Sequence, residues 1–122
     1  MNSFASLSDI KMAYNKATVL VFPSIHEGFG FPVIEAMACG CAIVSTENCM
    51  IPEIIENGVN GFMSNDDNEL SERLKSLLSD PKRAETIGRN ARKTIVEKYN
   101  LERFVDNWNN LLYSTVNEYR NI

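Results

Sequence analysis

Two short apolar runs joined by a helix-like segment constrain the fold of this chain more than any other feature. Residues 18–22 (Thr-Val-Leu-Val-Phe) and 42–45 (Ala-Ile-Val-Ser) are apolar and rich in β-branched side chains, and Pro23 stops the first run. Runs of this kind are typical of strands buried on both faces. Between them, Pro32 suits the first position of a helix and Gly40 suits its C-terminal end. Strand, loop, helix and strand form a βαβ unit with parallel strands.

Weaker signals surround this unit and extend the same pattern. They predict a helix capped by Ser8 or Asp9 and running through Ala17, a short helix over 52–57 that Gly58 ends, and a third strand over 61–64. Alternating elements with short connections favour a parallel sheet with helices on both faces. In such sheets ligands bind beyond the carboxyl ends of the strands, where residues 24–30 fall.

After residue 65 the pattern becomes purely helical. Asp66 with Glu69 predicts a capping box, Asp80-Pro81 starts a second helix, and Asn100 caps a last one. The apolar stripes of these helices are Leu70, Leu74, Leu77 and Leu78; Ala84, Ile87, Ala91 and Ile95; and Leu101, Phe104, Val105, Trp108, Leu111, Leu112 and Val116. We expect these stripes, and Trp108 in particular, to form core.

The length and patterning predict one domain over 1–122. Its α/β part covers approximately 1–65 and its C-terminal helices cover 66–122, with no linker between them. The fold class is α/β.

Composition excludes several classes of protein. The net charge is −4 and no run of Lys and Arg is present, which argues against nucleic acid as a partner. No apolar run approaches the roughly 20 residues of a membrane span, and residues 1–4 do not resemble the start of a secretory leader. The three cysteines cannot all pair, and His26 is the only histidine. We therefore expect buried thiols, no metal site and a soluble cytoplasmic protein.

The loop between the two strands carries the strongest functional signal. Glu27 and Glu35 lie eight residues apart, on either side of Gly28 and Gly30. The glycines allow a ligand to approach the backbone, and the N–H groups of a helix start attract phosphate or sugar hydroxyls. Glu35 is the only charged side chain between Pro32 and Val44, so we expect a poorly solvated carboxylate that needs hydrogen-bond donors from a ligand.

These residues resemble a known family. The run VFPSIHEGFGFPVIEAMACGCAIVST, the later stretch PEIIENGVNGF and the tail IGRNARKTIVEKYNLERF resemble the C-terminal part of retaining GT-B glycosyltransferases of the glycosyl transferases group 1 family. Glu27 and Glu35 fit the family's E-x7-E pattern. The resemblance implies a partial Rossmann-like three-layer domain, the second half of a donor-binding domain, with C-terminal helices.

The resemblance also implies roles for individual residues. Glu27 would be catalytic: it would contact the donor sugar and help to stabilise charge that develops at its anomeric region. Gly28 and the backbone amides of Phe29, Gly30 and Phe31 would reach sugar hydroxyls or the distal phosphate. Glu35 would accept hydrogen bonds from the ribose. The substrate would be a nucleotide-sugar, with no metal or other cofactor. We interpret Ser24 and His26 as loop residues.

One departure from the family matters for function. Those enzymes grip the donor diphosphate with an Arg and a Lys located upstream, and bind the acceptor on a separate N-terminal domain. From residue 17 to residue 72 this chain has no Lys or Arg, but it has nine acidic residues. We therefore expect a portion of an enzyme that is inactive alone. An exposed sheet edge would need a missing N-terminal acceptor domain, the upstream half of the donor domain, or a homodimer to cover it.

Two other functions remain open at this point. The chain is alternatively a non-catalytic donor-domain subunit or scaffold of a split transferase, or a sugar-nucleotide epimerase of the same fold. The sequence does not identify the base and sugar of the donor, or the acceptor.

Overall fold

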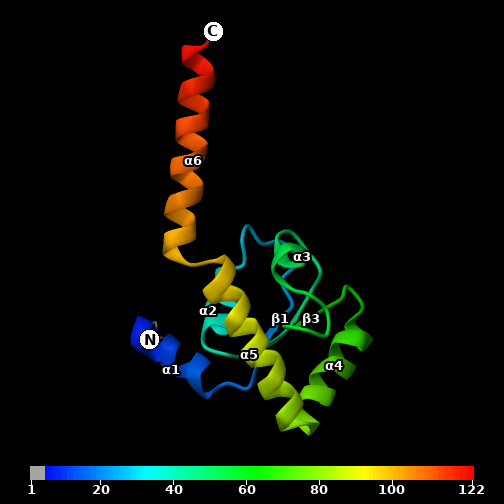
Figure 1. Ribbon diagram of the computed structural model, residues 1–122. Helices are drawn as coiled ribbons and strands as arrows, with labels where there is room; N and C mark the ends of the chain where they lie inside the picture. Colours follow the sequence, from blue (N-terminus) through cyan, green and yellow to red (C-terminus); the bar gives the residue numbers. More distant parts are fainter. Residues whose placement is uncertain (1–4) are drawn as a thin grey trace.

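The described part of the chain forms a sheet of three parallel strands. The computed structural model describes residues 5–122, and places β1 (Val19–Phe22), β2 (Ala42–Ser45) and β3 (Phe62–Met63) in the order β1-β2-β3 (Figure 1). In this register Val19 lies opposite Ala42 and Val44 lies opposite Phe62. The predicted βαβ unit and third strand are confirmed.

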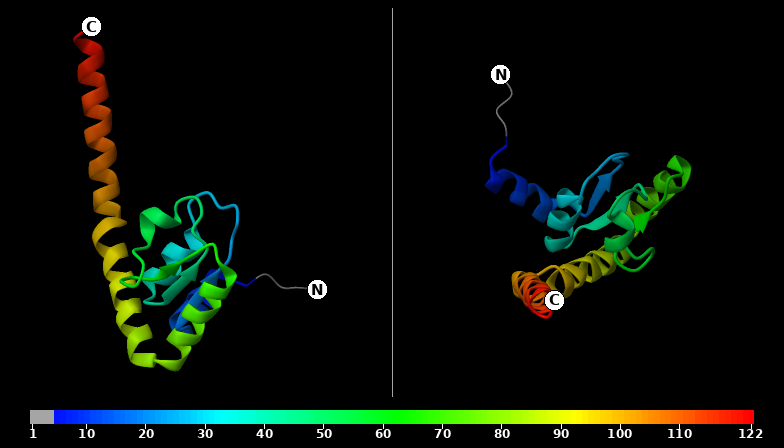
Figure 2. Two further views of the ribbon diagram at one scale, coloured as in Figure 1. Left: turned by 90° about the vertical axis from the view of Figure 1, so that its right-hand side faces the viewer. Right: turned by 90° about the horizontal axis from the view of Figure 1, so that it is seen from above.

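Helices account for most of the remaining chain. They are α1 (Leu7–Lys16), α2 (Phe31–Ala38), α3 (Ile51–Ile54), α4 (Asp67–Ser79), α5 (Pro81–Lys98) and α6 (Leu101–Arg120). Figure 2 shows α5 running along the body while α6 extends away from it. The C-terminal helices begin close to the predicted residue 66.

Strand β2 is the centre of two cores. Ile43 packs with α2, α3 and α5 in one cluster, which includes Val33, Met37 and Ile95. Its neighbours Ala42 and Val44 face the opposite way, into a second cluster. Successive side chains of a strand point to opposite faces of the sheet. Both faces of β2 are therefore covered, as the sequence predicts.

Strand β1 is less buried than expected. Every residue of β2 is buried, whereas no residue of β1 is fully buried and Val21 is 45% exposed. The prediction of a buried first strand is wrong for residues 5–122, because β1 lies at the edge of their sheet. An apolar edge strand of this kind is available for pairing.

Close backbone contact fixes α5 against the turn between α2 and β2. A Cβ atom added to Gly88 would lie 2.0 Å from the carbonyl oxygen of Gly40. Nearby, an Arg92 guanidinium N–H donates to the Ala38 carbonyl at 2.6 Å, at the C-terminal end of α2. A cation there satisfies a carbonyl that has no partner within the helix. Gly88 and Arg92 thus join α5 to the βαβ unit.

Two helix caps differ in detail from the prediction. Helix α1 is capped by Ser6, not by Ser8 or Asp9; the Ser6 hydroxyl accepts from the Asp9 N–H while the Asp9 carboxylate accepts from the Ser6 N–H. Asp66 caps α4 as predicted, by accepting from the Asn68 and Glu69 N–H groups.

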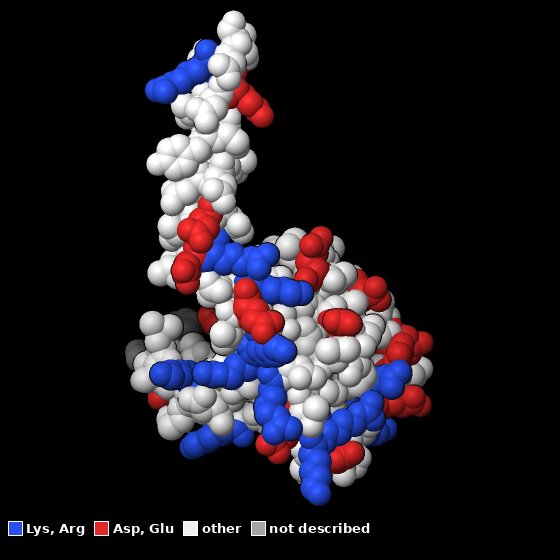
Figure 3. Space-filling model, viewed as in Figure 1, with Lys and Arg blue, Asp and Glu red and all other residues white. Residues whose placement is uncertain are grey.

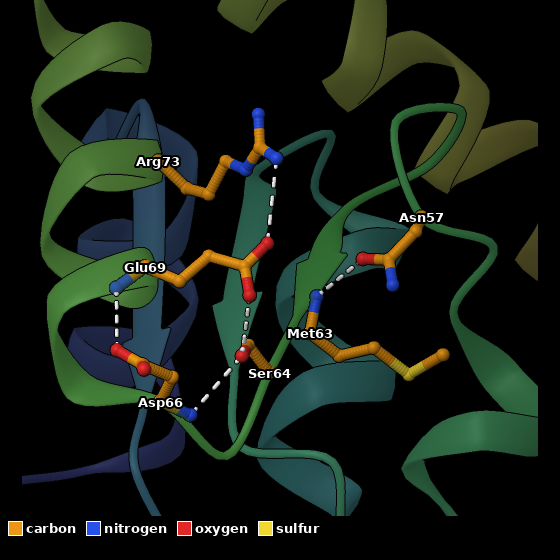
Figure 4. Close-up of polar contacts among 6 residues, drawn as sticks. All are labelled: Asn57, Met63, Ser64, Asp66, Glu69 and Arg73. Atoms are coloured by element: carbon orange, nitrogen blue, oxygen red, sulfur yellow. Dashed lines mark hydrogen bonds and ion pairs between the residues drawn. The ribbon is translucent and has the colours of Figure 1, made fainter.

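The expected reciprocal capping box at Asp66 is absent, however. The Asp66 N–H donates to the Ser64 hydroxyl, which in turn donates to the Glu69 carboxylate at 2.7 Å (Figure 4). Arg73 contacts the other oxygen of the same carboxylate at 3.3 Å. Ser64 therefore takes the place that the prediction gave to Glu69.

The predicted end of α3 and the predicted burial of Leu78 also need correction. Helix α3 ends at Ile54 rather than Asn57, and Gly58 lies in the turn that follows, with φ of +80°. In α4, Leu70 and Leu77 are buried and Leu74 is half-buried, but Leu78 is 61% exposed.

Helix α6 contradicts the largest core prediction. None of its residues is buried, and Trp108 is 49% exposed. The rest of the predicted stripe is exposed as well: Leu101, Phe104, Val105, Leu111, Leu112 and Val116. Asn100 does cap the helix, since its side chain accepts from the Arg103 N–H. The spacing predicted the helix correctly, but residues 5–122 supply no surface that covers its apolar face.

Candidate functional site

The loop that follows β1 is tied to the segment that follows β2. The Ser24 carbonyl accepts from the Thr46 hydroxyl and from the Asn48 side-chain amide, the latter at 3.3 Å. The Ser24 hydroxyl donates to the His26 carbonyl at 3.2 Å. Ser24 is therefore a loop residue, as predicted, and the loop is anchored at the carboxyl edge of the sheet, where ligands of parallel α/β sheets bind.

Gly30 turns this loop into helix α2. Its φ is +80°, and an added Cβ would lie 3.2 Å from Ile51 Cδ1, so both conformation and space favour glycine. The Gly30 carbonyl accepts from the N–H groups of Val33 and Ile34. Phe31 is the first helical residue and Pro32 the second, so the helix begins one residue earlier than predicted. The N–H of Phe31 has no intrahelical acceptor at this position.

The Glu27 side chain is half-buried in this loop. None of the ion pairs among residues 5–122 involves it. The positive end of the α2 dipole lies a few residues further along the chain, and α2 has no acidic residue in its first turn. The loop thus combines an unpaired carboxylate with backbone N–H groups at a helix start.

Glu35 is placed differently from the prediction. Its side chain is exposed, so the expectation of a poorly solvated carboxylate is wrong: the apolar residues around it in the sequence face the core, and Glu35 does not. The Tyr14 hydroxyl donates to Glu35 Oε2 at 3.3 Å. Burial, and then the nearby Glu35 charge, raise the pKa of Tyr14.

Glu35 also lines a hollow between α1 and α2. This hollow has a volume of about 290 Å³, and Ile10, Lys11, Tyr14 and Ala38 contribute to its walls. Sequence reasoning missed Tyr14 and Lys11 because they precede Glu35 by more than 20 residues. The one available signal was that Ile10 and Tyr14 share a helical face, which in the structure lines this hollow beside α2.

A second hollow lies on the other side of α2. It has a volume of about 580 Å³ and extends from Phe29 and Phe31 to the junction of α5 and α6, where Lys98 and Arg103 contribute to its wall. Phe29 and Phe31 face this hollow, whereas Glu35 faces the smaller one. The sequence did not predict that cations approach the glycine loop, because they come from elements about 70 residues away.

Side chains that bind metals are dispersed. The described part of the chain contains no group of three or more His, Cys, Asp or Glu residues that could hold a metal ion. The expectation of buried thiols holds for Cys41, whose thiol donates to the Tyr14 carbonyl at 3.1 Å, but not for exposed Cys49. Burial, and then Cys39, raise the pKa of Cys41.

No helix within residues 5–122 is both long and apolar enough to cross a membrane.

Residues 2–94 match the model of the family described as Glycosyl transferases group 1. The chain belongs to the Glycosyl transferases group 1 family. Among its relatives is "Uncharacterized glycosyltransferase MJ1607" of Methanocaldococcus jannaschii, which is 35% identical over 120 residues. That alignment covers 96% of this chain and 29% of the relative. The chain therefore spans about a third of the length of such a Glycosyl transferases group 1 protein.

Solved structures support the same membership and the predicted fold class. The C-terminal domain of a glycosyl transferase group 1 family protein, LpcC of Francisella tularensis, is similar with a TM-score of 0.74 and 31% identity, over 83% of this chain and 53% of that one. Anabaena HepE in complex with UDP-glucose gives a TM-score of 0.80 and 25% identity, over 91% and 31% of the two chains. The fold is that of a GT-B, Rossmann-like C-terminal domain.

Proposed function

We propose that this chain is the donor-binding portion of a retaining glycosyltransferase, which transfers a sugar from a nucleotide-sugar to an acceptor. The observation that carries the proposal is the anchored loop from Ser24 to Gly30: it holds the unpaired Glu27 beside the start of α2, in a chain of the Glycosyl transferases group 1 family. The donor-binding part of this unit is the α/β region up to about residue 65, and the helices beyond it support that region.

The start of α2 suits the sugar and distal phosphate. The backbone N–H of Phe31 has no intrahelical acceptor, and the nearby helix dipole favours a negative group. Glu27 then contacts the donor sugar, where its carboxylate stabilises positive charge that develops at the anomeric carbon as the phosphate leaves. Gly28 leaves open space around its backbone, since an added Cβ would meet nothing within 4 Å.

The smaller hollow suits the nucleoside. Glu35 accepts hydrogen bonds from the ribose hydroxyls, and the Tyr14 hydroxyl holds one of its oxygens at 3.3 Å. The apolar walls from α1 and α2 leave room for the base beside the ribose. This arrangement uses no metal ion and no cofactor.

The diphosphate is the weak point of the site within this chain. Residues 17–72 contribute no Lys or Arg, and helix N–H groups alone offset the repulsion of nearby carboxylates only in part. We therefore propose that the remaining cations, and the acceptor site, come from other parts of a longer transferase or from a partner chain. Binding by the isolated chain is then weak, at about millimolar Kd.

An NMR titration tests this proposal. UDP-glucose is added to the labelled chain, with GDP- and ADP-sugars in parallel, and to the variants Glu27→Gln and Glu35→Gln. We expect weak saturable binding, and Glu35→Gln weakens binding of both the nucleotide-sugar and the free nucleotide about fivefold. Glu27→Gln weakens only the nucleotide-sugar. Unchanged affinity in both variants contradicts the assignment, as does submicromolar binding or turnover by the isolated chain.

A second candidate function is a non-catalytic donor-domain subunit of a split transferase. The exposed apolar face of α6 favours this function, because contact with another chain would bury its apolar side chains. Purification of the natural protein with its associated chains distinguishes the two. A separate acceptor-domain polypeptide that restores transfer supports the subunit, whereas one continuous polypeptide contradicts it.

A further inference from the structure

The larger hollow has an unusual lining for a surface beside a sugar-binding loop. Four aromatic rings border it, and Phe29 is their centre: its ring centroid lies 5.3 Å from that of Phe31 and 6.2 Å from that of Tyr99. Phe104 of α6 supplies the fourth ring. Phe31 is 66% exposed and Phe104 is 59% exposed, so these rings are not used up by the core.

Its polar lining has two cations, and also the Asn107 side-chain amide, which can both donate and accept hydrogen bonds. Lys98 and Arg103 line the hollow, and neither forms an ion pair in the part of the chain that the structure describes. The Asn100 side chain is already occupied, because it donates to the Val96 carbonyl and accepts from the Arg103 N–H. No carboxylate is among the lining residues.

Acidic side chains do lie close to this site. Glu97, Glu102 and Asp106 line an adjacent groove that shares Arg103 with the hollow. Glu97 contacts Lys93 at 3.9 Å, which offsets one of these charges. Figure 3 shows the same mixture of acidic and basic side chains where α6 joins the body. The preference for an anion is therefore local to the side of the hollow that Lys98 and Arg103 face.

This combination defines a ligand chemistry. Rings and the Ile34 side chain favour an apolar body, and two donor-only cations favour an anionic group at one end of it. A neutral sugar fits less well, since it carries no charge to pair with the two cations. We propose that the hollow binds an amphiphilic anion, an apolar chain or ring system that ends in a phosphate or carboxylate.

The hollow adjoins the glycine loop. Phe29 and Phe31 line it and belong to the same loop as Glu27, which is not itself among the lining residues. Binding in the hollow does not depend on the proposed donor site.

Binding of geranyl phosphate tests the proposal directly. Trp108 is the only tryptophan of the chain, and its ring lies 6.3 Å from that of Phe104, so its fluorescence reports on the hollow. Amide NMR supplies a second readout at Phe29 and Phe31. We expect saturable binding of geranyl phosphate, about tenfold weaker binding of geraniol, and no saturable effect of inorganic phosphate.

Variants separate the two parts of the recognition. The double variant Lys98→Gln, Arg103→Gln weakens geranyl phosphate about tenfold and leaves geraniol unchanged, whereas Phe104→Ala weakens both. Arg120→Gln, at the far end of α6, is the matched control and changes neither. Equal binding by wild type and the double variant overturns the proposal, as does an absence of saturable binding. Vesicles that contain an anionic lipid distinguish a headgroup from a soluble ligand.

The test is independent of the donor site. Failure of geranyl phosphate to bind, with normal UDP-glucose shifts at Glu27 and Glu35, overturns this inference alone. Loss of UDP-glucose binding with normal geranyl phosphate binding overturns the proposed donor site and leaves the hollow standing.

Discussion

Helices α5 and α6 follow each other in the chain and have the same kind of apolar stripe, but only one of them is buried. Helix α5 buries Ala84, Ile87, Gly88, Ala91 and Ile95, whereas α6 buries nothing. Gly88 lets α5 approach the backbone at Gly40, whereas no surface within residues 5–122 covers the apolar face of α6. The spacing of apolar residues therefore predicts a helix and its apolar face, but it does not predict which surface buries that face.

The substitution Gly88→Ala disrupts the close contact between α5 and Gly40, and we expect it to have the largest effect on stability. The new methyl group would lie 2.0 Å from the Gly40 carbonyl oxygen, and a backbone atom cannot move aside cheaply. We expect a loss of about 3 kcal/mol in the free energy of unfolding, measured by urea titration. Gly28→Ala is the control and changes stability by less than about 1 kcal/mol, since nothing lies within 4 Å there. Equal stability of the two variants would show that α5 does not pack this closely.

A matched pair of truncations measures the contrast itself. Ile87 on α5 is 3% exposed, and Leu111 on α6 is 55% exposed. Ile87→Ala creates a cavity and lowers the free energy of unfolding by about 2–4 kcal/mol, whereas Leu111→Ala changes it by about 0.5 kcal/mol or less. The same urea titration checks both. A large loss for Leu111→Ala at all protein concentrations would mean that α6 folds back onto the body; a loss only at high concentration would support the predicted homodimer, though through α6.

Helix α1 provides an intermediate case and the smallest expected effect. It also buries no residue, but half-buried Tyr14 links it to Glu35. Burial and the Glu35 charge raise the pKa of Tyr14 above its ordinary value of 10.0, so the folded chain holds this proton more tightly than the unfolded chain does. The contribution to stability is complete below pH 10 and is lost as the pH rises through the folded pKa.

Urea titrations at about pH 8 and about pH 11 test this coupling. We expect Tyr14→Phe to lose less stability over that interval than the wild type, while Tyr113→Phe, which alters a tyrosine that is 71% exposed, behaves like the wild type. Tyr99 shows the same direction of pKa shift, from burial and then Glu53, so part of the alkaline loss remains in Tyr14→Phe. Identical pH dependence in wild type and Tyr14→Phe would contradict the Tyr14–Glu35 contact.

The sequence predicted best what is decided locally or by near neighbours. The limits of β2 and the Asn100 cap depend on residues within a few positions, and both are confirmed. The burial of β1 and α6 depends on which other surfaces pack against them, and the apolar residues of these two elements do not reveal that. Solvation of Glu35 was misjudged for a related reason: apolar neighbours in sequence do not lie around a side chain that points away from the core.

The pattern of apolar and polar residues along the sequence could not predict contacts between residues that are far apart in the chain. Tyr14 meets Glu35 across 21 residues, and Lys98 and Arg103 reach the hollow beside Phe29 from helices that the sequence could not orient. The roles of Glu27 and Glu35 stay predictions.

A residue-by-residue map of amide NMR shifts during titration with UDP-glucose tests the proposed donor site most directly. We expect the shifts to concentrate in the loop from Gly28 to Phe31 and around Tyr14 and Glu35, on the two sides of α2, and we expect no response from α4. Saturable shifts confined to α4 or α6, or no saturable shift at all up to about ten millimolar, would contradict the proposed donor site.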